Sequence, residues 1–207
     1  MLNINNIGDT MIGKISIKAL LASTILAFSL GQAALAAEVH GIKFEETTKV
    51  AGKELKLNGL GMRTKFVVKV YAAGLYLPKQ EKTADEIMKL DGPRRMTLVM
   101  VRDVSSDDFG DAFMAGLNAN SSKEEKTKIL PQIGQFGEMF AMLPGIKKGD
   151  VLHLDWIPGS GTQCELNGKK IGGVMPDLQF YNAVLRIWLG DKPVDRSLKP
   201  KLLGDDK

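Results

Sequence analysis

The 207-residue sequence is poor in cysteine and histidine, and this scarcity limits the chemistry it can carry. Its one cysteine, Cys164, cannot form an internal disulfide and is interpreted as a small strand residue rather than a nucleophile. Two histidines, His40 and His153, are too few and too far from that cysteine for a zinc site. We therefore expect no metal site and no cofactor.

A strong charge of one sign is also missing. The formal net charge is only +4 and the basic residues are scattered, so no nucleic-acid partner is expected. The longest charged run, KEEKTK at 123–128, has mixed sign and is typical of a solvated helix face.

Two familiar catalytic patterns are incomplete. His153 and Asp155 share one face of a predicted strand, but no nucleophile elbow accompanies them, and an exposed strand face explains the pair more simply. The glycines of PGSGTQCELNGKKIGG flank a predicted hairpin, whereas a phosphate-binding loop joins a strand to a helix.

Long hydrophobic runs are absent as well. The longest, ALLASTILAFSL at 19–30, is about half the ~20 residues that a membrane-spanning helix needs. It follows Lys14 and Lys18 and precedes small residues, an order that predicts a secretory signal peptide over 1–36, cleaved before Ala37. We expect a periplasmic protein with no stable membrane span after cleavage and a single domain over 37–207.

The remaining sequence has alternating strand-like and helix-like patterns. Strands are predicted over 39–44, 54–57 and onward to 77, 95–101, 150–157, 162–166 and 169–174; helices over 84–90, from 105 to about 117, from about 123 to 143, and over 177–189. This order favours an α+β fold in which helices pack on one face of an antiparallel sheet. The Phe- and Met-rich stripes of the helices fit either core packing or the lining of an apolar pocket.

The stretch NGLGMRTKFVVKVYAAGLYL (58–77) combines a strand-like apolar pattern, in which Phe66, Val68 and Val70 alternate with their neighbours, with Arg63 and Tyr71. An outward arginine needs no explanation, but an inward one must meet an anion or several acceptors. The two side chains lie roughly 26 Å apart on a straight strand. They could share a site only if a turn near Thr64 and Lys65 folds the chain back.

Three blocks carry a family resemblance: LNGLGMRTKFVVKVYAAGLYL (57–77), FGDAFMAGL (109–117) and AVLRIWLGDKPVDRSLKPKLLG (183–204). The chain resembles the chalcone isomerase-like family, in particular its bacterial exported branch, over about 39–204. This resemblance implies an open-faced β-sandwich, in which a layer of helices covers a large antiparallel sheet and a ligand cleft lies between them.

The resemblance also bears on function. Arg63 matches the arginine that stabilises developing negative charge in the plant isomerases. Tyr71, Phe109, Gly116 and Ile187 stand where those enzymes have polar site residues, so most of the polar set is missing, which argues against isomerase activity.

The plastid fatty-acid-binding members offer the better match. They hold a carboxylate with an arginine and a tyrosine, which correspond here to Arg63 and Tyr71, while the aromatic helices would cover the tail. We therefore predict a non-catalytic protein that binds a small amphipathic carboxylate, a fatty or aromatic acid. The predicted ligand-binding residues are Arg63, Tyr71, Phe109, Phe113, Gly116 and Ile187. The alternatives are an isomerase or lyase acting on an enone-containing phenolic compound, with Arg63 as its catalytic residue, and a structural protein with an envelope protein partner.

Overall fold

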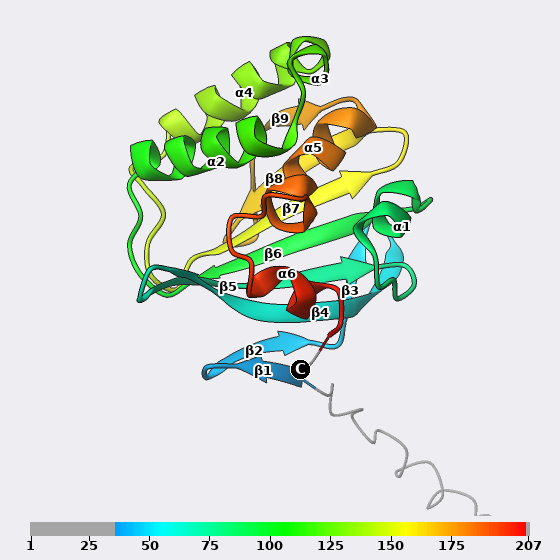
Figure 1. The fold of residues 1–207 in the computed structure, drawn as a ribbon, viewed down its shortest axis with the longest axis vertical. Coiled ribbons are helices and arrows are strands. Elements are labelled where there is room, and N and C mark those ends of the chain that lie inside the picture. The colour runs from blue at the N-terminus through cyan, green and yellow to red at the C-terminus, as the bar shows by residue number, and fades with distance from the viewer. Residues whose placement is uncertain (1–35, 206–207) are drawn as a thin grey trace, which may run out of the picture. The chain divides into compact units, whose positions relative to one another are not determined.

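A computed structural model describes residues 36–205, so the expected signal peptide lies outside the described residues. Seven antiparallel strands form one sheet in the order of the chain (Figure 1). They are β3 (Thr47–Val50), β4 (Lys53–Lys65), β5 (Val68–Leu77), β6 (Arg94–Met100), β7 (Val151–Ile157), β8 (Gly161–Leu166) and β9 (Lys169–Met175). The predicted turn between the last two strands is confirmed, since Asn167 and Gly168 both have positive φ, 51° and 78°.

A separate hairpin, β1 (Ala36–Val39) and β2 (Ile42–Glu45), packs against the outer face of this sheet. The single strand predicted over 39–44 is wrong, because His40 and Gly41 take positive φ values of 52° and 82° and reverse the chain. Phe44 then lies against Gly74, where any side chain would clash with its ring.

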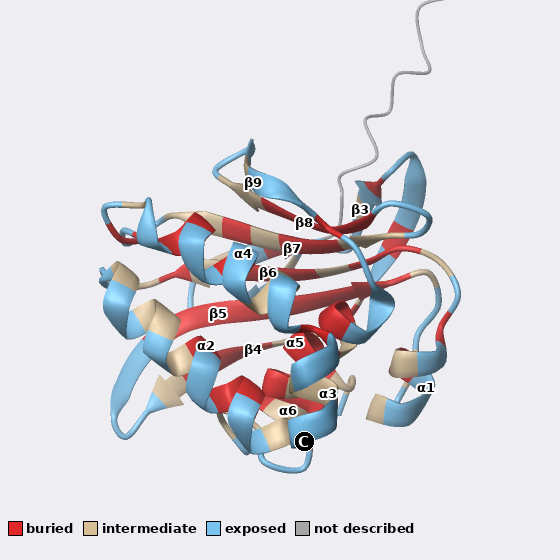
Figure 2. Cartoon of the chain, turned by 90° about the horizontal axis from the view of Figure 1, so that it is seen from above, coloured by how far each residue is buried: buried red, intermediate tan, exposed pale blue. Residues whose placement is uncertain are grey.

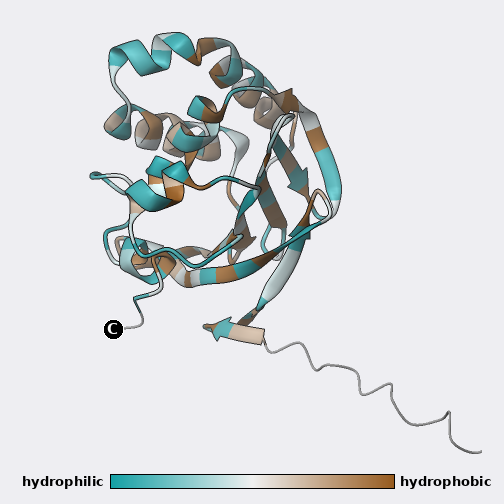
Figure 3. Ribbon diagram, turned by 90° about the vertical axis from the view of Figure 1, so that its right-hand side faces the viewer, coloured by the Kyte–Doolittle hydropathy of each residue, from teal (hydrophilic) through white to brown (hydrophobic). Residues whose placement is uncertain are grey.

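Six helices complete the described part of the chain: α1 (Ala84–Lys89), α2 (Ser106–Asn120), α3 (Lys123–Lys128), α4 (Leu130–Ala141), α5 (Leu178–Leu189) and α6 (Leu198–Leu202). Ile129 and Pro131 separate α3 from α4 where one helix was predicted. The final helix, α6, was not predicted. Figures 1 and 3 show the helix layer on the inner side of the curled sheet and the β1–β2 hairpin on the outer side. The predicted α+β class and the open-faced sandwich are confirmed.

The main core lies between the sheet and α5. Most residues of α5 are buried, as the red segments of Figure 2 show. Phe113 of α2 stacks on Phe136 of α4 with ring centroids 4.0 Å apart. Cys164, on β8, is completely buried in this core, as expected for a small strand residue, and burial raises its thiol pKa well above the ordinary range. It is therefore not a reactive thiolate at neutral pH.

The β4–β5 hairpin departs from the predicted alternation. Phe66 and Val67 do not continue a strand but form the turn, and their side chains are 93% and 91% exposed. Phe66 has a φ of 57°, which bulky residues rarely adopt. The chain reversal itself was required for Arg63 and Tyr71 to meet, and it occurs just beyond the predicted position.

Among residues 36–205, no helix is both long enough and apolar enough to cross a bilayer.

Candidate functional site

Arg63 and Tyr71 sit directly opposite each other on β4 and β5. The turn at 66–67 folds the two strands together, so side chains eight positions apart in sequence become cross-strand neighbours. The guanidinium carbon of Arg63 lies 5.3 Å from the centroid of the Tyr71 ring, a cation–π distance. The structure therefore brings the two residues into one place.

Arg63 points inward and is only 8% exposed. Within residues 36–205 it makes no hydrogen bond and no ion pair, and its Nε atom is fully buried without a partner. Arginine keeps its proton in proteins, and an unpaired buried charge costs several kcal/mol. The arrangement is therefore one that an anion would complete.

Tyr71 presents a hydroxyl that is only partly used. The indole Nε1–H of Trp188, on α5, donates a hydrogen bond of 2.8 Å to the Tyr71 oxygen. The phenolic proton has no acceptor among the described residues and is free to be donated to a ligand. Burial raises the pKa of Tyr71 to about 12, although Arg63 and the Trp188 hydrogen bond lower it in part, so the phenol stays protonated at neutral pH.

A β-bulge helps to place the arginine. The pairing of β4 with β5 shifts register between Arg63 and Thr64, which frees the Thr64 amide from the ladder. That amide donates to Oδ2 of Asp195 at 2.8 Å. Burial alone would raise the Asp195 pKa, but this bond and those from Ser197 and Leu198 outweigh it and lower the pKa. The same carboxylate thus anchors the end of β4 and the start of α6.

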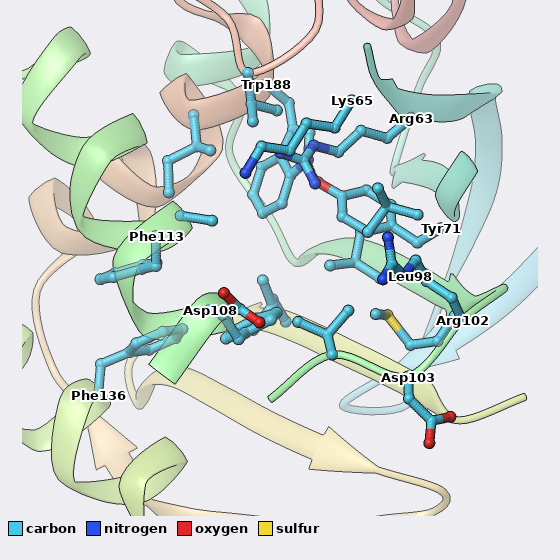
Figure 4. A pocket seen from close by; sticks show the side chains of 18 residues that line it. Arg63, Lys65, Tyr71, Leu98, Arg102, Asp103, Asp108, Phe113, Phe136 and Trp188 are labelled. Carbon is cyan, nitrogen blue, oxygen red and sulfur yellow. Dashed lines mark hydrogen bonds between the residues drawn. The ribbon is translucent and has the colours of Figure 1, made fainter. Parts of the chain in front are cut away.

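These groups open onto a cavity of about 260 Å³ between the sheet and the helices. Aromatic and aliphatic side chains form most of its lining, with Arg63 and Tyr71 on one side and Phe113 and Phe136 opposite (Figure 4). The lining residues are Arg63, Lys65, Val70, Tyr71, Leu98, Met100, Arg102, Asp103, Val104, Asp108, Phe109, Ala112, Phe113, Phe136, Leu154, Ile187, Trp188 and Val194.

Charged side chains surround the opening of this cavity. Lys65, Arg102, Asp103 and Asp108 belong to the lining and are solvent-exposed. Asp103 already pairs with Lys147 at 3.2 Å. The cavity therefore combines exposed charged residues and a mostly apolar lining with the buried cation of Arg63.

The predicted ligand-binding residues fall into two groups. Arg63, Tyr71, Phe109, Phe113 and Ile187 all line the cavity. Gly116 does not; it lies where α2 meets α5, and a Cβ atom there would come within 2.7 Å of Ile187 Cγ2. The glycine therefore allows the two helices to approach closely.

Sequence reasoning did not assign Trp188, Lys65, Arg102 or Asp108 to the site, and it gave Phe136 only as part of a helix stripe that fits either core packing or a pocket lining. Trp188 stands next to Ile187 in the third family block, and its indole N–H is the kind of buried donor that requires a partner. Lys65 is the last residue of β4, and Arg102 lies two residues after β6. No pattern in the sequence distinguishes them from the other scattered basic residues.

A second hollow, about 530 Å³ in volume, is lined by polar residues near α1, α2 and α5. Its largest polar side chains already have partners: Arg186 bonds Glu125 at 3.1 Å, and Asn120 accepts from the Lys192 amide at 2.9 Å, whereas the buried Ser121 hydroxyl has none among the described residues. The larger volume therefore does not indicate a ligand site, and the aromatic cavity with its unpaired arginine is the stronger candidate.

The pair His153 and Asp155 is not an exposed strand face. Asp155 is 5% exposed and receives two hydrogen bonds from Arg95, at 2.7 and 2.6 Å, on the outer side of the sheet. His153 bonds Thr97 through Nδ1 at 2.9 Å. Burial, with Arg95 nearby, lowers the His153 pKa to about 4. The two residues have separate structural partners and do not form a catalytic pair.

Comparisons with known proteins agree with this fold. Residues 36–204 match the sequence model of a family described as chalcone isomerase-like. Among solved structures, the fold is similar to that of a fatty-acid binding protein from Arabidopsis thaliana, with a TM-score of 0.61 and 17% identity over 82% of this chain and 96% of the other. No curated protein matches the chain.

Proposed function

Because the chain belongs to the chalcone isomerase-like family, we propose that it is a non-catalytic binding protein for a small amphipathic carboxylate, held in the cavity between sheet and helices. Arg63 would bind the carboxylate and Tyr71 would donate a further hydrogen bond. The apolar lining from α2, α4 and α5 would cover the rest of the ligand.

The unpaired guanidinium of Arg63 is the observation that carries this proposal. A buried cation without an acceptor is costly, whereas a carboxylate can receive two parallel N–H bonds from one guanidinium. The fatty-acid binding protein with a similar fold supports a binding role over a catalytic one.

The cavity also limits the size of the ligand. Its volume of about 260 Å³ is slightly below the roughly 300–1,000 Å³ typical of small-molecule sites. Aromatic rings from Phe109, Phe113 and Trp188 line it. These dimensions favour a medium-chain or single-ring acid over a long-chain lipid.

Isothermal titration calorimetry with octanoate and cinnamate tests the proposal. The matched control ligand is methyl octanoate, which lacks the charge, and the matched control variant is Arg196→Met, which removes an exposed arginine. We expect Arg63→Met to weaken octanoate binding by about 10- to 100-fold, the worth of a charge-assisted hydrogen bond, and to leave ester binding unchanged. Equal affinity of the wild type and Arg63→Met for octanoate would refute the role of Arg63.

A second candidate function rests on the same side chain. A guanidinium with no anionic partner could instead stabilise negative charge that develops during ring closure of an enone-containing phenol, as in an isomerase or lyase of the family. Absorbance measurements with a 2′-hydroxychalcone test it. Turnover above the buffer rate that is lost in Arg63→Ala would favour catalysis.

We further propose that the protein is exported to the periplasm after cleavage of the signal peptide expected over 1–36. Amino-terminal sequencing of the protein from a periplasmic extract should then give Ala37 as the first residue. An envelope protein partner stays a prediction.

A further inference from the structure

We propose that the tip of the β4–β5 hairpin docks the protein on a lipid bilayer with anionic headgroups. The tip consists of Phe66 and Val67, whose exposed fractions of 93% and 91% are the highest among the exposed large apolar residues. Val68, beside them, is 42% exposed. Three consecutive apolar side chains thus project into water from one turn.

Neither packing nor turn geometry accounts for these residues. Two-residue hairpin turns favour Asn and Gly, because one or both positions need a positive φ. Phe66 takes a φ of 57°, which an asparagine or glycine would adopt at lower cost. Because phenylalanine adds no stability to the folded chain at this position, we infer that its side chain contacts another molecule or a membrane.

The charged residues around the tip indicate what kind of surface it contacts. Lys65 and Lys69 flank the tip and are exposed. Arg102 is close by: it lines the same cavity as Lys65, and the amide of its neighbour Val101 donates a backbone hydrogen bond of 3.1 Å to the Val70 carbonyl. Asp103 and Asp108 line the same cavity, and Asp103 pairs with Lys147 at 3.2 Å. The charges next to the tip in the chain are the two lysines, and an apolar turn between lysines suits an anionic lipid surface.

The size of the tip also favours lipid over protein. A stable protein interface buries roughly 800 Å² on each partner, far more than two or three side chains supply. A bilayer can accept a single inserted turn. The hairpin tip lies at the same end of the sheet as the β6–α2 connection, which contributes Arg102 and Asp103 to the cavity opening (Figures 1 and 2). Docking would therefore turn the opening toward the headgroups.

Flotation with vesicles tests this inference on the full chain, so that every protein compared carries the same N-terminal segment. The vesicles contain phosphatidylcholine alone or with one-third phosphatidylglycerol. We expect binding to the anionic vesicles that falls with added salt, and a loss of at least about tenfold in Phe66→Ser/Val67→Ser. The control Leu130→Ser removes an apolar side chain that is 62% exposed on α4 and should bind as the wild type does.

A second variant keeps the test independent of how the double variant folds. Phe66→Trp retains a large ring at the tip, and its fluorescence should shift to the blue on addition of anionic vesicles and be quenched by brominated lipid. Binding to vesicles that is absent, or equal in the wild type and Phe66→Ser/Val67→Ser, would overturn the inference. Sedimentation velocity without lipid provides a further check. If the wild type forms a dimer that Phe66→Ser/Val67→Ser does not form, the tip serves self-association, and the inference is overturned as well. The affinity for octanoate should not change in either tip variant, so the membrane-docking inference and the proposed ligand-binding function can be tested independently.

Discussion

Replacement of Arg63 by methionine should make the ligand-free protein more stable while it weakens acid binding. Arg63 is 8% exposed and has no hydrogen-bond or ion-pair partner among the described residues, so the folded state bears much of the desolvation cost of its charge. That cost is several kcal/mol for an unpaired buried ion, and the cation–π contact with Tyr71 offsets only about 0.5–2 kcal/mol of this cost. Methionine has a similar length, no charge, and rotamers that adapt to an apolar site.

We therefore expect Arg63→Met to raise the free energy of unfolding by about 1–2 kcal/mol. For a domain of this size, 1 kcal/mol shifts the melting temperature by about 2–4 °C, which gives an increase of roughly 2–8 °C. The assay is urea and thermal denaturation of protein freed of bound small molecules. Arg196→Met, at an exposed position, should stay within about 0.5 kcal/mol of the wild type.

Addition of octanoate should reverse this order. A ligand at 100 times its Kd stabilises the folded state by about 2.7 kcal/mol, and only the wild type should gain this amount. If ligand-free Arg63→Met is instead less stable than the wild type by more than about 1 kcal/mol, Arg63 serves the fold and the reasoning from an uncompensated charge is refuted.

Other substitutions test the packing and charge around the site. Trp188→Phe removes the donor to Tyr71 and should lower the free energy of unfolding by about 1 kcal/mol in urea denaturation; no change would mean that the 2.8 Å bond adds nothing. Gly116→Ala places a methyl group 2.7 Å from Ile187 and should cost about 1–3 kcal/mol by overpacking, measured in the same way. Burial holds the His153 pKa at about 4, below its value of 6.5 in the unfolded chain, so its contribution to stability is complete above pH 6.5 and is lost as the pH falls toward 4. Urea midpoints across this range should decline less in His153→Gln than in the wild type; parallel declines would contradict the assignment.

The sequence predicted the elements whose signals are local. The helices predicted from 84 and from 105 are examples: Thr83 and Ser105 cap α1 and α2, because a short polar side chain before an apolar period satisfies free amides at a helix start. The Asn167–Gly168 turn was equally clear, since few residue pairs accept positive φ twice. Where residues close in sequence decide the local conformation, the sequence is enough to predict it.

The errors occurred where distant contacts decide the conformation. α6 spans only five residues and is held by Asp195 and by Gly59 and Gly61 of β4, which allow Leu198 and Leu202 to approach. No periodicity marks so short a helix. The burial of Asp155 was also missed, because it depends on Arg95, which is 60 residues away in sequence but directly opposite on the neighbouring strand β6.

The site itself was only partly predictable. The pairing of Arg63 with Tyr71 needed a turn that sequence alone could not place, because Phe66 and Val67 look like strand residues. Trp188 was overlooked because a helix that is apolar on nearly every side offers no face by which to select one residue.

The position of α5 near the end of the chain has a consequence for biosynthesis. This helix forms the centre of the core, yet residues 178–189 leave the ribosome after all the strands. A nascent chain that ends before Asp177 therefore exposes the inner side of its sheet, which cannot yet exclude water. We expect cooperative folding only once α5 has been synthesised, so that a chain truncated before Asp177 is aggregation-prone and is not a smaller stable domain.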